Sequence, residues 1–206
     1  LRNKSITGLR INHVEKEIFG QEFFASMTEL LEQYEDLVQT SDQQEVPSNE
    51  YKSVAASEPV NSGWVVLCLV FDQTGQILLI KQPWANGWLV PGGAKKADES
   101  LRATAIREIE EETGVIIRPT RPHWIHDHTV KNAETGETTG WKNVYFGAIA
   151  DKTNIQIGSG LDEEEIADAQ WFDGLPDSLY NPETLKQLYE RVHTHLRTNE
   201  DISLAE

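Results

Sequence analysis

The sequence lacks the features that would support a disulfide scaffold or a membrane anchor. Cys68 is the only cysteine among 206 residues, which excludes an intrachain disulfide and fits a reducing compartment. The longest apolar stretch, residues 64–71, has the length of a strand and falls far short of the roughly 20 residues of a membrane span. We therefore expect no membrane-spanning segment and a cytoplasmic location.

Basic residues are also scarce. Lysine and arginine number 18 against 34 acidic residues, which gives a net charge of −16. Such a surface repels nucleic acid polymers and anionic membranes. A small phosphorylated partner remains compatible with it, because bound cations reverse the charge locally. Apolar residues make up 38% of the chain, so a packed core is feasible.

The first 60 residues differ from the rest in composition. Apolar side chains recur there at helical spacing, which predicts helix within residues 1–40: Phe19, Phe23, Met27, Leu30, Tyr34 and Leu37. Residues 39–59 are polar and are predicted to be a linker. These apolar side chains have two interpretations. They pack on the main domain, or they form a homodimer contact or a cover over the active site. Residues 1–60 are thus predicted to be a helical extension with a polar linker.

The main domain is predicted to span 61–198, followed by a tail at 199–206. Short apolar runs predict strands at residues 63–72, 76–82, 88–93, 115–117, 123–130, 144–150 and 168–173. Helices are expected at 98–113 and 182–197, and Gly114 has the position of a helix C-cap. Adjacent strand pairs with interspersed helices predict a mixed sheet between helices.

Carboxylates gather on one side of the first of these helices. Glu108, Glu111 and Glu112 are spaced i, i+3 and i+4 and therefore share a face, whereas Glu110 points elsewhere. Three carboxylates this close repel one another, and a hard divalent cation such as Mg²⁺ or Mn²⁺ would offset the repulsion. The alternative interpretation is a solvated acidic face.

A glycine loop precedes this helix. Pro91, Gly92 and Gly93 bring bare backbone close to the start of the loop–helix unit, and glycine permits a close approach that a side chain would block. A carbonyl here can join a metal shell. Taken alone, the same three residues would indicate only a tight turn.

Together the loop and helix match a known signature. The defined positions are Gly93, then after five residues Glu99, then after seven residues Arg107-Glu108, apolar Ile109, Glu111-Glu112 one residue later, and Gly114-Val115 after one more. This stretch resembles the Nudix box of the Nudix hydrolases at every fixed place. The resemblance implies an α/β fold, a Nudix-type α/β/α sandwich with a mixed β-sheet.

The resemblance also implies roles. In the family, residues matching Glu108, Glu111 and Glu112 bind the catalytic Mg²⁺ or Mn²⁺, the residue matching Arg107 orients them, and the carbonyl matching Gly92 can join the metal. The implied reaction is attack of metal-activated water on a phosphorus of a diphosphate.

Two further acidic positions complete the implied site. The residue matching Glu99 contributes to the metal site or holds the loop. Family members often place a general base before a late strand, where Glu165 is our choice. A solvated acidic turn is the alternative for Glu165, and Glu111 or Glu112 can serve as the base instead.

Aromatic and basic residues near the loop are candidate substrate contacts. Trp88, Lys81 and Gly93 are predicted to bind substrate, with Trp88 stacking on a base. Other aromatic side chains can do the same, although ordinary packing is the alternative for each: Trp84, Trp141 and Tyr145. His126 and His128 alternate along a strand, so they share a face, as structural histidines or as an acid–base group.

The substrate class is a nucleotide-like small molecule. ADP-ribose-cleaving members usually carry a proline 15 or 16 residues beyond the box, where this chain has Val130-Lys131. We therefore favour a nucleoside triphosphate, canonical or oxidised, over ADP-ribose or a nucleotide sugar. A non-catalytic nucleotide sensor is the rival hypothesis. Such sensors usually lose the carboxylates, so the intact box favours an enzyme.

Overall fold

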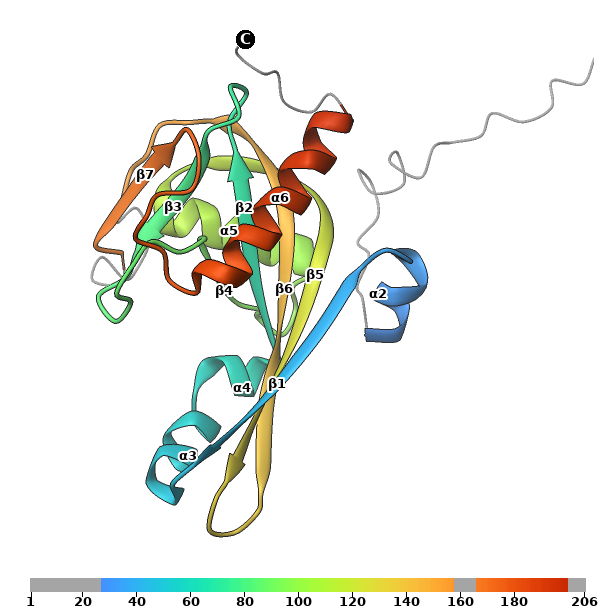
Figure 1. Ribbon diagram of the computed structural model, residues 1–206, viewed down its shortest axis with the longest axis vertical. Helices are drawn as coiled ribbons and strands as arrows, with labels where there is room; N and C mark the ends of the chain where they lie inside the picture. Colours follow the sequence, from blue (N-terminus) through green and yellow to red (C-terminus); the bar gives the residue numbers. More distant parts are fainter. Residues whose placement is uncertain (1–26, 158–165, 200–206) are drawn as a thin grey trace, which may run out of the picture.

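The computed structural model describes residues 27–157 and 166–199. Figure 1 shows a twisted sheet with α5 behind it, α6 in front of it and a long β5–β6 hairpin extending away. The described elements are α2 (Met27–Gln33), β1 (Val38–Val46), α3 (Ser48–Ala55), α4 (Glu58–Ser62), β2 (Trp64–Phe71), β3 (Ile77–Lys81), β4 (Gly92–Ala94), α5 (Leu101–Thr113), β5 (Ile116–Asn132), β6 (Thr138–Lys152), β7 (Asp168–Phe172) and α6 (Pro182–Thr198).

The seven strands form one mixed sheet in the order β1-β5-β6-β2-β3-β7, with β4 paired to β2. The β1–β5 and β2–β6 pairs are parallel, and the others are antiparallel. One core cluster joins the sheet to α5 through Leu101, Ala105 and Ile109. A second joins the opposite face to α6, in part through Leu185 and Leu188, and a small third one contains Ile80, Ile166 and Ala169. The expected α/β/α sandwich with a mixed sheet is confirmed.

Helix α5 has well-defined ends. The Ser100 side chain accepts a hydrogen bond from the Ala103 N–H at 3.1 Å, as an N-cap does. Gly114 ends the helix with a left-handed φ of 69°, which confirms its predicted C-cap position. Cys68 is fully buried on the α5 side of the sheet, as expected for a small apolar residue. Burial, with the nearby carboxylate of Glu112, raises the pKa of this thiol.

The predicted linker is wrong. Residues 39–59, expected to be a polar linker, contain most of β1, all of α3 and the start of α4. In β1 only Val46 is buried, while the seven residues between Val38 and Val46 are exposed, so apolar periodicity could not reveal the strand. Backbone pairing with β5 holds it in the sheet.

The predicted N-terminal helix is only partly described. Helix α2 begins at Met27 and ends at Gln33, and the prediction for residues 1–26 lies outside the described residues. The helix also stops earlier than expected, because residues 38–40 already belong to β1. Leu30 is buried in the core cluster beside α5. No helix in the described ranges is long and apolar enough to cross a membrane.

Candidate functional site

Arg107 lies at the centre of the carboxylate cluster. Its Nε and Nη2 donate to the two oxygens of Glu99 at 2.5 and 2.9 Å. Its Nη1 lies 2.8 Å from Glu111 and 2.7 Å from Glu108, and Nη2 also donates to the Ala94 carbonyl at 3.1 Å. A guanidinium is planar and has five N–H donors, so it can bind several carboxylates at once. One side chain therefore ties β4, the loop and α5 together, as an orienting residue must.

Glu99 is bound to the loop itself. Besides its contacts with Arg107, its Oε2 accepts from the Lys96 N–H at 3.2 Å and from the Thr104 hydroxyl at 3.1 Å. The Arg107 hydrogen bonds lower the pKa of Glu99 to about 2, so the residue stays ionised. Both oxygens are engaged within the protein, which favours the loop-holding role over metal ligation.

Glu108 packs directly against backbone. A Cβ on Gly93 would lie 2.5 Å from the Glu108 Oε2 atom, so a side chain at this position would displace the carboxylate. Burial raises the pKa of Glu108 even though Arg107 acts in the opposite direction. The carboxylate is thus held in a partly desolvated position beside the glycine loop.

Glu112 is fixed by the neighbouring glycine. The Gly92 N–H donates to Glu112 Oε2 at 2.8 Å, and the Gln82 amide donates to Oε1 at 3.4 Å. Gly92 has a φ of 143°, and a Cβ there would lie 2.1 Å from the Val66 carbonyl oxygen across the β2–β4 pair. Both the positive φ and the close approach of the Val66 carbonyl therefore require glycine at position 92. The role of the Gly92 carbonyl in metal binding stays a prediction.

The charge and chemistry of this cluster fit a divalent cation. Arg107 is shared by three carboxylates, and Lys96 adds a more distant positive charge at 3.8 Å from Glu111. Two positive side chains therefore face three carboxylates, and Glu112 adds a fourth carboxylate. The side-chain donors on this face of α5 are all oxygens, which Mg²⁺ and Mn²⁺ prefer. Glu108, Glu111 and Glu112 are the residues that would hold such an ion.

A cavity of about 510 Å³ reaches the glycine loop, a size typical of small-molecule sites. Gly92 and Gly93 line one part of it, and its aromatic lining consists of Trp84, Trp141, Tyr145, Tyr180 and His128. Trp84 is 66% exposed, and its ring meets Tyr180 edge-on at 5.4 Å between centroids. This exposed pair can take up a planar ligand group.

Trp88 and Lys81 do not line this cavity. Trp88 is 7% exposed, packs edge-on against Phe172 at 4.8 Å between centroids, and is covered by the Lys81 Nζ at 4.5 Å from its centroid. Trp88 and Lys81 thus pack against each other, and their contact with substrate stays a prediction. Gly93 lines the cavity, and its contact with substrate stays a prediction too.

The predicted general base, Glu165, lies outside the described residues, and its role stays a prediction. Sequence reasoning also missed cavity residues such as Tyr180 and Asn143. Asn143 had a usable signal, because it alternates with Trp141 and Tyr145 along one strand. Tyr180 had none, since the irregular segment before α6 brings it to the cavity.

A larger and more open hollow of about 910 Å³ runs along α6. Asp36, His123, Arg191 and His195 are among its lining residues. None of the predicted site residues that the structure describes lies there. We therefore take the cavity at the glycine loop as the candidate active site.

The fold and this loop–helix carboxylate centre define the class of protein. Residues 62–192 match the family model described as NUDIX domain, which covers more than half of the chain. The chain belongs to the Nudix family.

The chain is also similar to individual proteins. The chain is 29% identical over 104 residues to the Nudix hydrolase YvcI of Bacillus subtilis (strain 168), covering 50% of this chain but only 62% of that relative. Among solved structures, it is similar to a UDP-X diphosphatase, at 22% identity and a TM-score of 0.48, over 82% of this chain and 77% of that one. It is also similar to a MutT Nudix hydrolase from Burkholderia pseudomallei, at 27% identity and a TM-score of 0.48, over 63% of this chain and 96% of that one.

Proposed function

We propose that the chain hydrolyses a diphosphate linkage in a nucleoside diphosphate derivative, using Mg²⁺ or Mn²⁺ bound by Glu108, Glu111 and Glu112. One observation carries the proposal. The carboxylates of α5 gather at Arg107 and at the N–H of Gly92, beside a cavity of about 510 Å³.

The residues of the chain have separate tasks in this reaction. Bound divalent cations lower the pKa of water and neutralise charge on phosphoryl oxygens. Arg107 keeps Glu108 and Glu111 at fixed positions along α5. The Gly92 N–H fixes Glu112, so that less side-chain reorganisation is needed when substrate binds.

The attacking water must lose a proton to a carboxylate. We assign this role to Glu165, with Glu111 and Glu112 as alternatives. Glu112 is 9% exposed and already accepts two hydrogen bonds. Glu111 has the more exposed side chain, at 45%. Of these two alternatives, Glu111 is therefore the better placed to meet water.

A nucleoside triphosphate, canonical or oxidised, is the proposed substrate. Its phosphates would lie toward Gly93, and its base would lie against the exposed ring of Trp84. Aromatic rings stack on any nucleobase, which makes this contact tolerant of base identity. ADP-ribose and nucleotide sugars are the alternative substrates, because the same cavity offers two aromatic regions, at Trp84 with Tyr180 and at Trp141.

A nucleotide sensor without activity is the second candidate function. The two candidates differ in what the carboxylates do, since a sensor needs only the cavity. Glu108, Glu111 and Glu112 are all present, and Gly93 is kept free of a side chain where Glu108 requires the space. These features support hydrolysis.

Hydrolysis of a panel of compounds, followed by chromatography of the nucleotide products, tests the proposal. The panel contains nucleoside triphosphates, ADP-ribose, nucleotide sugars and dinucleoside polyphosphates, each assayed with Mg²⁺ and with Mn²⁺. We expect hydrolysis of at least one triphosphate, its loss in excess EDTA, and its return when metal is restored. Full turnover in EDTA would contradict the metal mechanism, and tight binding without hydrolysis across the panel would favour the sensor.

A further inference from the structure

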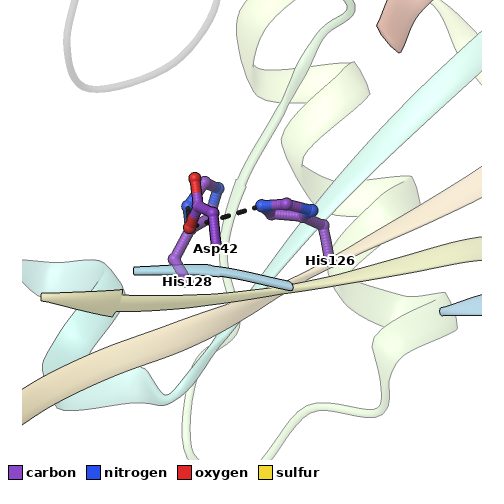
Figure 2. A group of neighbouring side chains, drawn as sticks. All are labelled: Asp42, His126 and His128. Atoms are coloured by element: carbon purple, nitrogen blue, oxygen red, sulfur yellow. Dashed lines mark hydrogen bonds and ion pairs between the residues drawn. The ribbon is translucent and has the colours of Figure 1, made fainter. Parts of the chain in front are cut away.

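A second cluster of possible metal ligands lies on strands β1 and β5. Their parallel register places Asp42 opposite His128 and Thr40 opposite His126. Figure 2 shows Asp42, His126 and His128 gathered on one face of these strands. One nitrogen of each ring and one carboxylate oxygen lie within 4.8 Å of one another. The cluster is separate from the carboxylates of α5.

The ring of His126 is held by residues behind it. Thr40 Oγ1 lies 2.7 Å from His126 Nδ1, and the Trp124 indole N–H donates to the same hydroxyl at 2.8 Å. With Nδ1 engaged, Nε2 is the nitrogen that faces Asp42, at 3.5 Å. Histidines that bind metals usually have the other ring nitrogen hydrogen-bonded in this way.

The ring of His128 is positioned from two sides. Its Nδ1 lies 2.8 Å from Asp42 Oδ1, and its plane lies 31° from that of Trp141, with 5.0 Å between centroids. Asp42 has 54% of its side chain exposed, which gives an ion access to the carboxylate. Asp42 and His128 both line the cavity that reaches Gly93.

We propose that Asp42, His126 and His128 bind one transition-metal ion, with Zn²⁺ the best fit. Two imidazoles and one carboxylate suit zinc and similar ions but not Mg²⁺, which prefers oxygen ligands. Zinc lies about 2.1 Å from such donors, so two of them are at most about 4.2 Å apart. Asp42 Oδ1 already meets this limit, at 3.5 Å from His126 Nε2 and 2.8 Å from His128 Nδ1. One nitrogen of each imidazole lies within 4.8 Å of the other, so a small rotation of the rings is enough to bring both to an ion.

Three protein ligands leave a fourth position for water or an anionic oxygen. Because Asp42 and His128 line the cavity, an ion here adds positive charge to the wall formed by β1 and β5. An anionic group of a small molecule is then the natural fourth ligand. This consequence rests on the proposed function, whereas metal binding itself does not.

Titration of the metal-stripped chain with Zn²⁺ alone tests the site. Isothermal calorimetry should detect one equivalent that is lost, or weakened at least about tenfold, in His126→Gln, His128→Gln and Asp42→Asn. Asp127→Asn is the matched control, because Asp127 lies between the two histidines but its carboxylate is 3.4 Å from Lys142. Glu111→Gln should also keep this equivalent, which separates it from any zinc on α5.

Cobalt gives a second measurement that needs no variant. Co²⁺ added to the parent chain should produce visible absorption bands of a four-coordinate site and paramagnetically shifted imidazole resonances. Absence of shifted imidazole signals would overturn the proposal, even if a ligand variant failed to fold. Equal zinc affinity in the parent and the histidine variants would overturn it too. Either result would leave Asp42 and His128 as an ion pair only, whatever the outcome of the hydrolysis assays.

Discussion

The Glu108 carboxylate occupies the space that a side chain at Gly93 would need: a Cβ on Gly93 would lie 2.5 Å from Glu108 Oε2. The absence of a side chain lets β4 close against α5. Glu108 is thereby held close to Arg107 and beside Gly93, which lines the cavity. The position of one carboxylate therefore depends on the identity of a residue 15 positions earlier in the chain.

Gly93→Ala should displace Glu108 and reduce hydrolysis. A shift of about 1 Å at a catalytic group can cost on the order of a hundredfold in rate, and we expect a kcat loss of that size. Gly174→Ala is the control, because a Cβ there meets nothing within 4 Å. Steady-state kinetics with Mg²⁺ measures both. Parental activity in Gly93→Ala would mean that Glu108 tolerates displacement and is not a metal ligand.

The four glutamates of α5 should separate into two groups. Glu108→Gln, Glu111→Gln and Glu112→Gln each remove a proposed ligand, and we expect rate losses on the order of a thousandfold. Glu110 is exposed and lies on another face of the helix, so Glu110→Gln should behave like the parent. Glutamine preserves shape and helix propensity, and kcat measured with saturating metal reports the difference.

Thermal unfolding without metal provides the control for this series. Removing one negative charge from the crowded face should not lower the melting temperature. A loss of activity that follows a loss of stability would assign these residues a structural role. Equal activity losses at all four positions, Glu110 included, would point to a general effect of acidity.

Trp84→Ala should weaken substrate binding with little effect on the chemical step. Loss of one base–aromatic stack costs about 1–3 kcal/mol, so KM should rise about tenfold or more while kcat changes little. Ile157→Ala removes another exposed apolar side chain that does not line the cavity, and serves as the control. An unchanged KM in Trp84→Ala would move the base elsewhere in the cavity.

His123 should make the protein less stable in mild acid. Burial lowers the pKa of His123 from 6.5 to about 3, and the positive charges of Arg121 and Arg191 act in the same direction. His123 Nε2 is buried without a hydrogen-bond partner in the described structure. The unfolded chain therefore binds a proton between pH 6.5 and 3 that the folded chain does not. Stability from this residue is present above pH 6.5 and is lost progressively as the pH falls toward 3.

Denaturant unfolding across this pH range measures the effect. A pKa difference of one corresponds to about 1.4 kcal/mol, so the free energy of unfolding of the parent should fall by on the order of a few kcal/mol more than that of His123→Phe. The substitution keeps a ring at the position and removes the proton site. Parallel pH profiles for the two proteins would show that His123 does not contribute.

The sequence was sufficient for the parts of the fold that depend on local signals. The buried stripe of Leu101, Ala105 and Ile109 and the cap at Gly114 predicted α5 closely. The helix starts at Leu101 rather than at residue 98, because Ser100 acts as the N-cap. The contact of Arg107 with Glu111 follows from their spacing, since residues four apart meet on a helix, whereas its contact with Glu99 joins the helix to the loop before it.

Other parts depend on contacts that no local pattern encodes. Strand β1 is polar along most of its length, and its cross-strand contacts lie far away in sequence, as between Thr40 and His126. Asp42 was therefore assigned to a linker, although the shared face of His126 and His128 was predicted correctly. The packing of Trp88 was not predicted either, because sequence alone could not show that Phe172 and Lys81 cover its ring.

The pairing of β1 with β5 also has a consequence for the order of folding. Asp42 meets His128 across 86 residues of chain, whereas β5 and β6 are joined by a short turn after Asn132. Closing a long loop costs entropy before its contacts can form. The hairpin should therefore form early and β1 should dock late. The carboxylate centre on α5 can then assemble before the wall of the cavity that Asp42 belongs to is complete.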